Sequence, residues 1–353
     1  MSRSWRLGFR KAFASILALA GIGLLAAPQA RALELKLQLY QGPQHLISQK
    51  VKQLSPSVEQ MTDGRVKISV FDSGTLAKGP QMFDAVEKGV VDIAAWTYAF
   101  ASPKNMPFLM VGTFPFIYRD AAGYINAWKD EALVALANEY IGEIGYRRVA
   151  ITKTFYVGFY QMGFKNKEPK VPADLKGTKV RTLGSIMPFF AKYGISAVSV
   201  DTPGVYEGLE RGIIDGAIGV YSNWVDWGWG EPATYLVDFN LAAVGLVFLV
   251  NKESMAKLSP ADRAVVDSYL GWLQDALNEE YLKADQTYKQ VISGHLMKIY
   301  TPNAKELGEW SAAREDIKAQ WLKDVGERGA KALSLIDKHN GELTYKKTTS
   351  GAK

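Results

Sequence analysis

The 353-residue chain contains no cysteine, and only three of its residues are histidines. The lack of cysteine excludes disulfide bonds, cysteine-ligated zinc and thiol nucleophiles. His45, His295 and His339 lie far apart and form no HExxH pair, which argues against a histidine-based metal centre. A chain of this length can bury a core that is stable without cross-links, and we expect it to form two domains.

The sequence also lacks the common signatures of enzymes. It has no GxSxG segment, no phosphate loop that ends in GK followed by Ser or Thr, and no GxGxxG segment after an expected strand. Residues 74–79 (GTLAKG) resemble a phosphate loop only weakly, because Pro80 occupies the position of the lysine. No pair of acidic residues stands out as a general acid and base. We therefore expect a protein that is not an enzyme and has no resident cofactor.

The first 32 residues have the pattern of a secretory signal peptide. Basic residues up to Lys11 precede an apolar run over 12–27, and the segment 28–32 (PQARA) supplies small residues for cleavage. The apolar run is shorter than the ~20 residues of a membrane span. We therefore expect residues 1–32 to be removed and the mature protein to lie in the periplasm. The alternative is an uncleaved N-terminal anchor.

The positive charge of the chain lies mainly in this leader. The whole sequence has 42 basic and 36 acidic residues, for a net charge of +6. The leader contains five of the basic residues and no acidic residue, so its removal leaves a net charge of +1. The basic character is therefore not a nucleic-acid signature, and we expect no nucleic-acid partner.

After the leader, apolar patterns predict two similar runs of strands and helices. The first run has expected strands at residues 35–39, 66–70 and 90–95 and expected helices at 45–61 and 80–88. The second run has expected strands at residues 179–182, 196–200 and 213–217 and expected helices at 187–193 and 203–211. This alternation favours parallel α/β sheets.

The two runs contain a matching segment. Residues 83–92 (FDAVEKGVVD) align with residues 206–215 (YEGLERGIID) at an offset of 123 residues. The glycine suits the left-handed position after a helix, and the β-branched pair suits a central strand. The match favours two related lobes, each with its own sheet. The alternative is coincidence, because helix–glycine–strand corners are common in α/β folds.

Arg181 is the main candidate for an anion site. It ends the segment 174–181 (DLKGTKVR), whose last residues are expected to form a short strand. Val180 and Arg181 should face opposite sides of the sheet. An arginine that points from a strand into a cleft offers a planar fork of donors that suits a carboxylate. The alternative is an arginine paired with a surface acid.

Several segments resemble the solute-binding subunits of tripartite ATP-independent periplasmic (TRAP) transporters, which bind C4-dicarboxylates and other organic acids. The matching segments are 74–76 (GTL), 89–92 (GVVD), 114–116 (FPF), 172–181 (PADLKGTKVR) and 212–216 (GIIDG). The resemblance covers nearly the whole chain after the leader. It implies two hinged lobes of the periplasmic-binding-protein kind that close around one organic acid, whose carboxylate pairs with Arg181.

The last third of the chain is expected to be helical. Ser259 and Pro260 form a helix start, and the amphipathic pattern continues to about Ser293. The expected fold is therefore α/β, with two lobes joined by a hinge and long C-terminal helices that brace both. We assign residues 33–154 and 241–285 to lobe I, residues 155–240 and 286–338 to lobe II, and residues 339–353 to a polar tail.

The sequence departs from the resembled family in two places. Many members carry a second ligand-facing arginine before the arginine motif, but residues 158–163 (GFYQMG) contain none. The QMG segment is similar to that of members that bind 2-oxo acids, in which the glutamine touches ligand and metal, so Gln161 is a candidate contact. Those members also carry a Glu-Trp pair, where this chain has Ile218 and Gly219. Without that carboxylate we expect no bound metal.

Aromatic residues gather near the same segments. Trp96 and Tyr221 follow the two matching segments, at strand ends where open α/β sheets bind ligands. Tyr160, Asn223 and Trp224 complete this group of candidate ligand contacts. An aromatic-lined pocket with one guanidinium suits a monocarboxylate with an apolar or aromatic body. The alternative for most of the aromatic residues is core or hinge packing.

His45 is the last candidate. It lies just before the first expected helix, in a loop that resembles the cleft-facing loop of the family. Its side chain could donate to a ligand or cap the helix, and capping is slightly favoured.

These patterns indicate a periplasmic receptor that captures a small organic acid and delivers it to TRAP membrane permease subunits. A secreted α/β enzyme acting on a small acid, the binding component of an ATP-driven importer and a structural periplasmic protein remain alternatives. The long helical C-terminal third favours the TRAP class. We expect a monomer, or a homodimer formed through a C-terminal helix.

Overall fold

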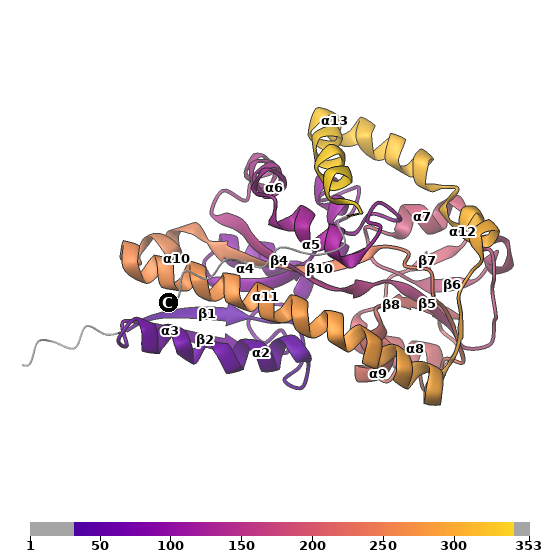
Figure 1. Ribbon diagram of the computed structural model, residues 1–353, viewed down its shortest axis with the longest axis horizontal. Helices are drawn as coiled ribbons and strands as arrows, with labels where there is room; N and C mark the ends of the chain where they lie inside the picture. The colour runs from indigo at the N-terminus through magenta and orange to yellow at the C-terminus, as the bar shows by residue number, and fades with distance from the viewer. Residues whose placement is uncertain (1–31, 342–353) are drawn as a thin grey trace, which may run out of the picture.

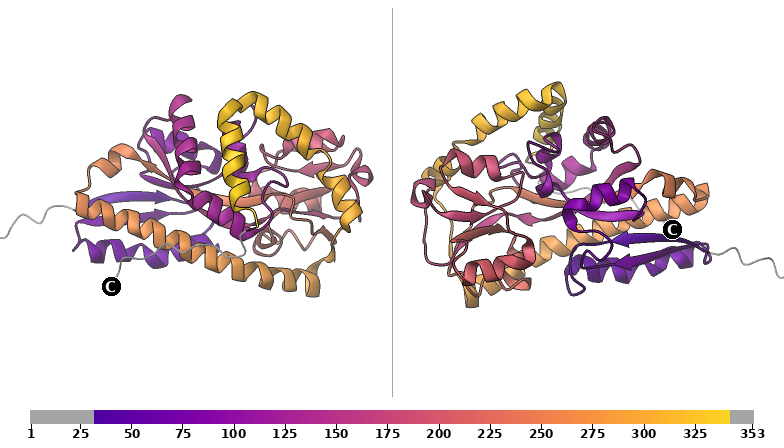
Figure 2. Two further views of the ribbon diagram at one scale, coloured as in Figure 1. Left: turned by 45° about the horizontal axis from the view of Figure 1, so that its top comes forward. Right: turned by 180° about the vertical axis from the view of Figure 1, so that it is seen from behind.

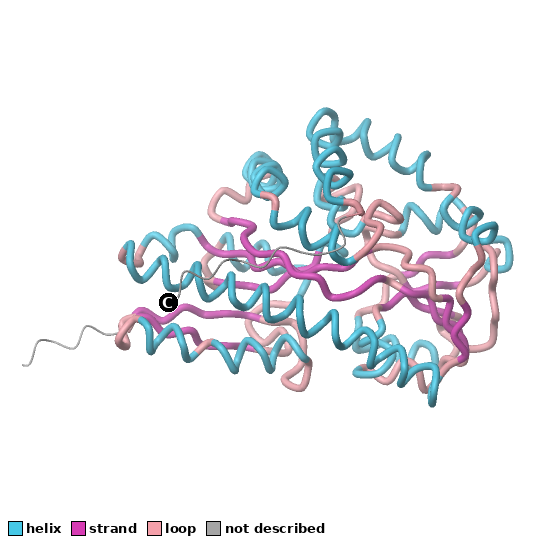
Figure 3. Tube along the Cα trace, in the orientation of Figure 1, coloured by secondary structure: helices cyan, strands magenta, loops and turns pink. Residues whose placement is uncertain are grey.

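The computed structural model describes residues 32–341. Over this range the chain forms two α/β lobes side by side, each built around one sheet (Figure 1). The strands lie in the middle of the molecule, and helices cover their outer faces (Figure 3). The predicted signal peptide and most of the predicted polar tail lie outside the described residues.

Lobe I is built on a sheet with the strand order β2-β1-β3-β10-β4. Its strands are β1 (Leu33–Gln38), β2 (Val66–Phe71), β3 (Ile93–Thr97), β4 (Val149–Phe159) and β10 (Ala243–Asn251). Its helices are α2 (Leu46–Leu54), α3 (Pro56–Met61), α4 (Met82–Glu87), α5 (Ala121–Lys129), α6 (Glu131–Glu143) and α10 (Lys252–Ala256). The single helix expected over 45–61 is two helices, because Pro56 has no N–H to donate to the preceding turn.

Lobe II is built on a sheet with the strand order β11-β9-β5-β8-β6-β7. Its strands are β5 (Gln161–Phe164), β6 (Lys179–Arg181), β7 (Ser196–Val198), β8 (Gly216–Gly219), β9 (Tyr235–Val237) and β11 (Lys298–Tyr300). Its short helices are α7 (Met187–Lys192), α8 (Val205–Glu210) and α9 (Tyr221–Asp226).

The two lobes repeat one unit, which explains the internal match. Strands β2-β1-β3 are parallel in lobe I, and β7-β6-β8 are parallel in lobe II. The N–H of Lys36 donates to the carboxylate of Asp92, and the N–H of Lys179 donates to that of Asp215, both at 2.8 Å. The predicted parallel order ends there, because an antiparallel strand follows in each lobe: β10 beside β3, and β5 beside β8.

The glycines of the repeat adopt the predicted left-handed conformation, whereas the residues after them are not in strands. Gly89 and Gly212 both have a φ of 69°. The first β-branched residue of each pair is exposed, Val90 by 45% and Ile213 by 58%. The strands predicted over 90–95 and 213–217 are present inside their sheets as β3 and β8, but each begins about three residues later, directly after Asp92 and Asp215, because the glycine turn lies at the surface.

Two stretches of chain cross between the lobes next to each other. β4 of lobe I continues into β5 of lobe II through Tyr160, and residues 238–242 return the chain to β10. The N–H of Tyr160 donates to the carbonyl of Ala242 at 2.9 Å, and the N–H of Leu241 donates to the carbonyl of Tyr160 at 3.0 Å. The chain therefore changes sheets at Tyr160 and not between residues 154 and 155.

Helix α11 (Pro260–Val291) runs along both lobes (Figures 1 and 2). In lobe I, Lys50 of α2 forms an ion pair with Glu280 of α11 at 3.2 Å. In lobe II, the hydroxyl of Tyr288 of α11 donates to Asp226 of α9 at 2.7 Å. A π-helical turn (Ile292–Leu296) follows. The expected brace across both lobes is therefore present.

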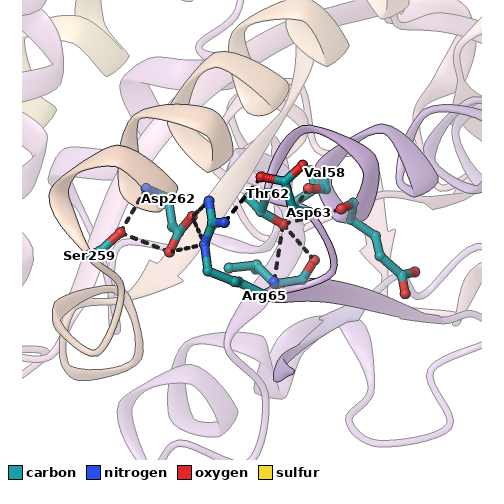
Figure 4. A network of polar contacts seen from close by, with 8 residues as sticks. Val58, Thr62, Asp63, Arg65, Ser259 and Asp262 are labelled. Atoms are coloured by element: carbon teal, nitrogen blue, oxygen red, sulfur yellow. Dashed lines mark hydrogen bonds and ion pairs between the residues drawn. The ribbon is translucent and has the colours of Figure 1, made fainter. Parts of the chain in front are cut away.

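The start of α11 is fixed to lobe I by a polar network (Figure 4). Ser259 caps the helix, because its hydroxyl accepts from the N–H of Asp262 at 3.1 Å. Arg65, which lies just before β2, donates from Nε and Nη2 to Asp262 at 3.1 and 2.9 Å. These bonds from Arg65, and one from Ser259, hold the pKa of Asp262 below its usual range. The predicted helix start is confirmed.

Helices α12 (Ala304–Ser311) and α13 (Arg314–His339) form the second brace. The indole of Trp310 in α12 donates to the carbonyl of Lys170 in lobe II at 2.8 Å. The indole of Trp321 in α13 donates to the carbonyl of Pro107 in lobe I at 2.6 Å. His339, which was assigned to the tail, is the buried last residue of α13. None of the helices within residues 32–341 is both long enough and apolar enough to cross a membrane.

Candidate functional site

A cavity of about 60 Å³ lies between the lobes, near the carboxyl ends of β1, β3, β6 and β8. It is lined by Tyr40, Gln41, His45, Thr97, Phe100, Val157, Tyr160, Arg181, Leu183, Thr202, Val220, Ser222, Asn223, Trp227, Trp229, Val244 and Leu246. A wider hollow of about 460 Å³ adjoins it. The two share Tyr40, Phe100, Arg181, Leu183, Thr202 and Trp227. The shared residues come from both lobes, so the wider hollow lies where the lobes meet.

Arg181 is the last residue of β6 and is only 2% exposed. Its Nε donates to the carbonyl of Val200 at 2.9 Å. Its Nη1 and Nη2 donate to the carbonyl of Ile218 at 3.4 Å and to the hydroxyl of Thr202 at 3.2 Å. A guanidinium has five N–H donors, so two remain, one on each terminal nitrogen. The three bonds hold the guanidinium rigid and leave a fork of donors free.

The charge of Arg181 has no counter-charge in contact with it. No carboxylate lies within ion-pair distance of Arg181 among residues 32–341. Burial lowers the pKa of Arg181, while the nearby Tyr160 and Asp201 act in the opposite direction. Its guanidinium carbon lies 5.3 Å from the centre of the Trp229 ring, which stabilises a cation. A buried, unpaired positive charge beside a cavity favours an anionic occupant.

Two tyrosines lie close to this guanidinium. Burial raises the pKa of Tyr160 to about 12, against the opposing effect of Arg181. Burial is also the largest cause that raises the pKa of Tyr40, and the nearby Tyr160 raises it further. Both phenols therefore stay neutral at physiological pH and can donate hydrogen bonds. Tyr160 was a predicted contact and lines the cavity, whereas Tyr40 was missed.

A sequence model of the bacterial extracellular solute-binding protein family 7 matches residues 39–324. The chain belongs to this family. The match covers both lobes and most of the C-terminal helices.

Two relatives of this family 7 protein are named as a transporter protein and as a periplasmic binding protein. The outer membrane transporter protein TsaT of Comamonas testosteroni is 26% identical in an alignment of length 342 that covers 94% of this chain and 97% of TsaT. The 2,3-diketo-L-gulonate-binding periplasmic protein YiaO of Escherichia coli is 25% identical in an alignment of length 312 that covers 83% of this chain and 87% of YiaO.

A solved structure shares the fold. The TRAP periplasmic solute-binding protein of Ralstonia eutropha H16, with bound (S)-2-acetolactate, gives a TM-score of 0.78 at 22% identity. The match covers 86% of this chain and 99% of that one. The predicted resemblance to TRAP solute-binding proteins and the predicted α/β fold are therefore confirmed.

His45 lines the cavity of the family 7 protein and does not cap its helix. It is the N-cap residue of α2, but its side chain makes no capping hydrogen bond. The slightly favoured capping role was therefore wrong. Burial lowers the pKa of His45 to about 4, so the ring is neutral at physiological pH. Its Nδ1 is buried and has no partner within the described residues.

The partly buried, neutral ring of His45 predicts a pH effect on stability. The ring has a pKa of about 4 when folded and about 6.5 when unfolded, so the unfolded chain binds more protons between these values. The free energy of unfolding should therefore fall on acidification below pH ~6.5, by about 1.4 kcal/mol per pH unit. For His45→Gln, we expect the loss between pH 7 and 5.5 to be about 1 kcal/mol smaller than in the wild type, as measured by urea unfolding.

The exposed His295 provides the matched control, because it lies outside the cavity. His295→Gln should lack the effect of the His45 variant. Identical pH dependence in His45→Gln and the wild type would contradict the assignment of a neutral ring with a lowered pKa.

Trp96 belongs to the core of lobe I and does not line the cavity. Its ring packs edge-on against Phe83, with centroids 4.8 Å apart. Successive strand residues face opposite sides of a sheet, so the next residue of β3, Thr97, lines the cavity instead. The strand end was predicted correctly, but the side of the strand was not.

The predicted ligand contacts on α9 also differ in whether they face the cavity. Asn223 lines the cavity, and its side chain accepts from the N–H of Val220 at 3.0 Å. Tyr221 turns away and donates to Asp238 at 2.6 Å. Trp224 is fully buried in lobe II, edge-on to Trp229 at 5.6 Å. The structure therefore brings one of these three residues to the cavity.

Gln161 lies at the crossing between the lobes and outside the cavity lining. Its Oε1 accepts from the N–H groups of Phe239 and Asn240 at 2.8 and 3.1 Å, and its Nε2 donates to the side chain of Asn240 at 2.8 Å. Gln161 therefore holds the two crossing stretches together. In the part of the chain that the structure describes, no group of three or more His, Asp or Glu side chains could hold a metal ion.

Gln41, Ser222 and Thr202 also line the cavity but were missed from the sequence. Gln41 follows the carboxyl end of β1, so the strand-end rule that selected Trp96 could have found it. Ser222 lies between two predicted residues on α9. No pattern in the sequence indicates that Thr202 lines the cavity.

The lobes also touch beside the cavity. Gly184, in the loop after β6 of lobe II, packs against the loop after β3 of lobe I. A Cβ atom at Gly184 would lie 2.7 Å from the carbonyl oxygen of Ala101 and 3.0 Å from the Cβ of Ser102. This close approach requires a residue without a side chain.

Proposed function

We propose that this family 7 protein is the periplasmic receptor of a TRAP transporter and that it binds a small organic acid through one carboxylate. The observation that carries the proposal is the buried guanidinium of Arg181, which has two free N–H donors and no carboxylate within ion-pair distance among the described residues. A carboxylate would accept both donors in a bidentate arrangement and neutralise the charge. Lobe closure would strengthen the pair by removing water.

The cavity size supports a small ligand. Space of about 60 Å³ accommodates roughly four to six water molecules, since one water needs roughly 10–15 Å³. An acid of a few carbon atoms would replace them. The apolar side chains of Val157, Val244 and Leu246 would contact its carbon skeleton, in keeping with a monocarboxylate.

The names of the relatives agree with an organic acid. YiaO is named for binding 2,3-diketo-L-gulonate, and the Ralstonia protein holds (S)-2-acetolactate. By the same analogy we propose membrane permease subunits of a TRAP transporter as the partner to which the ligand is delivered. An N-terminal signal peptide would bring the protein to the periplasm.

Titration of the intrinsic tryptophan fluorescence with mono- and dicarboxylates tests the proposal, because Trp227 and Trp229 line the cavity. We expect a saturable change with at least one acid. Recovery of that acid unchanged after incubation would support a receptor over an enzyme. The absence of any response across the panel would contradict the proposed function.

A further inference from the structure

Four residues that line the cavity each have a buried polar atom with no hydrogen-bond partner within the described residues. The four atoms are Oε1 of Gln41, Nδ1 of His45, Oγ of Ser222 and Nε1 of Trp229. Buried polar groups in folded proteins are nearly always paired, because an unpaired one loses its hydration without compensation. Four such atoms around one cavity indicate that its occupant pairs with them.

The charges of the lining restrict what the occupant can be. Arg181 is the only lining residue with a full charge, since burial keeps His45 neutral. One carboxylate balances Arg181. A second carboxylate would be buried among neutral groups without a counter-charge, which is unfavourable.

The unpaired atoms divide into two kinds. The indole of Trp229 can only donate, and its ring lies beside the guanidinium of Arg181. Trp229 therefore suits the carboxylate end of a ligand. The amide of Gln41, the neutral ring of His45 and the hydroxyl of Ser222 can each donate and accept. They suit a group that does both, such as a hydroxyl or an amide.

We infer that the ligand carries, besides its single carboxylate, an uncharged hydroxyl or amide group that Gln41, His45 and Ser222 hold. This inference rests on the proposed function and specifies its ligand class: hydroxy or amide monocarboxylic acids, in preference to purely apolar acids and dicarboxylates. Gln41 and His45 belong to lobe I, and Ser222 belongs to lobe II. The neutral group of the ligand therefore bridges the lobes and favours their closure.

The test compares acids of equal chain length by isothermal titration calorimetry: butanoate, the hydroxybutanoates with the hydroxyl at each carbon, and succinate. At least one hydroxybutanoate should bind about tenfold to a hundredfold more tightly than butanoate, because butanoate leaves the buried polar groups unpaired. Succinate should bind more weakly than that hydroxybutanoate. Equal binding of butanoate and every hydroxybutanoate, or tightest binding of succinate, would overturn the inference.

Two variants assign the preference to these residues. Ser222→Ala and Gln41→Leu should each reduce the preference for the hydroxybutanoate over butanoate, because the hydroxyl loses a partner while butanoate no longer leaves that polar group unpaired. Ser48→Ala is the matched control, because Ser48 also has a buried, unpartnered hydroxyl but does not line the cavity. A preference that survives in both cavity variants, or that falls equally in the control, would overturn the assignment.

The inference and the proposed function fail in different ways. If the wild type binds butanoate and hydroxybutanoates equally, and Arg181→Gln weakens both, then only the inference is wrong. If no acid binds in the fluorescence titration with mono- and dicarboxylates, then the proposed function is wrong, and the inference is overturned with it.

Discussion

Arg181→Gln should weaken binding of the preferred acid between about 30-fold and a few thousandfold. Removing one partner of a buried, hydrogen-bonded charge pair costs about 2–5 kcal/mol, and the loss shows mainly as faster dissociation. The glutamine keeps a polar side chain near the carbonyls of Val200 and Ile218, which accept from Arg181 in the wild type. Calorimetry gives the affinity, and stopped-flow fluorescence gives the dissociation rate.

Arg181→Lys separates the effect of charge from that of shape. The ammonium keeps the positive charge but lacks the planar fork that binds a carboxylate through two parallel bonds. The affinity of Arg181→Lys for the acid should therefore lie between the affinities of the wild type and of Arg181→Gln. Arg211→Gln is the control, because Arg211 also belongs to lobe II but forms an exposed pair with Glu207. If Arg181→Gln bound the acid with wild-type affinity, Arg181 could not be the residue that anchors the carboxylate.

The sequence sufficed for much of the fold because its signals are local or repeated. The glycine turns at Gly89 and Gly212 are set by the backbone itself, and the helix start at Ser259 is set by a cap. The repeat identified two similar halves before any tertiary contact was known. The antiparallel strands β5 and β10 could not be placed in this way, because each pairs with strands from a distant part of the chain.

The candidate site was predictable to the level of the strand end but not of the side chain. Arg181 and His45 were chosen from a motif and from a loop, and both line the cavity. Trp96 and Trp224 were chosen because they are aromatic and lie near strand ends, and both are core residues. A core residue and a residue that lines the cavity can be neighbours in the sequence whose side chains face different sides. Which side faces the cavity depends on tertiary packing, which the sequence does not display.

Gly184→Ala should weaken binding by about tenfold to a hundredfold without removing any ligand contact. The new Cβ atom would lie 2.7 Å from the backbone oxygen of Ala101 in the other lobe. Because that oxygen belongs to the main chain, the clash is relieved only by a shift of the backbone, and we expect the lobes to move apart. Overpacking of this kind costs about 1–3 kcal/mol, and a lower population of the closed form weakens apparent affinity in proportion.

Calorimetry and small-angle X-ray scattering together check this prediction. The affinity should fall, the ligand-dependent decrease in the radius of gyration should need more ligand, and the melting temperature of the free protein should be unchanged. Gly142→Ala in α6 is the control, because a Cβ atom there meets no atom within 4 Å. A lower melting temperature of the free variant at unchanged affinity would show instead that this contact serves stability.

The effect of Gly184→Ala on the binding of different acids separates lobe closure from direct ligand contact. Closure is one equilibrium that every bound acid uses, so the fold-loss in affinity should be the same for butanoate and for a hydroxybutanoate. Ser222→Ala should weaken only the hydroxybutanoate, because it removes one contact with the neutral group. In the double variant the two losses should therefore multiply for the hydroxybutanoate. A loss in Gly184→Ala that depends on the acid would show that the loop at Gly184 takes part in ligand selection.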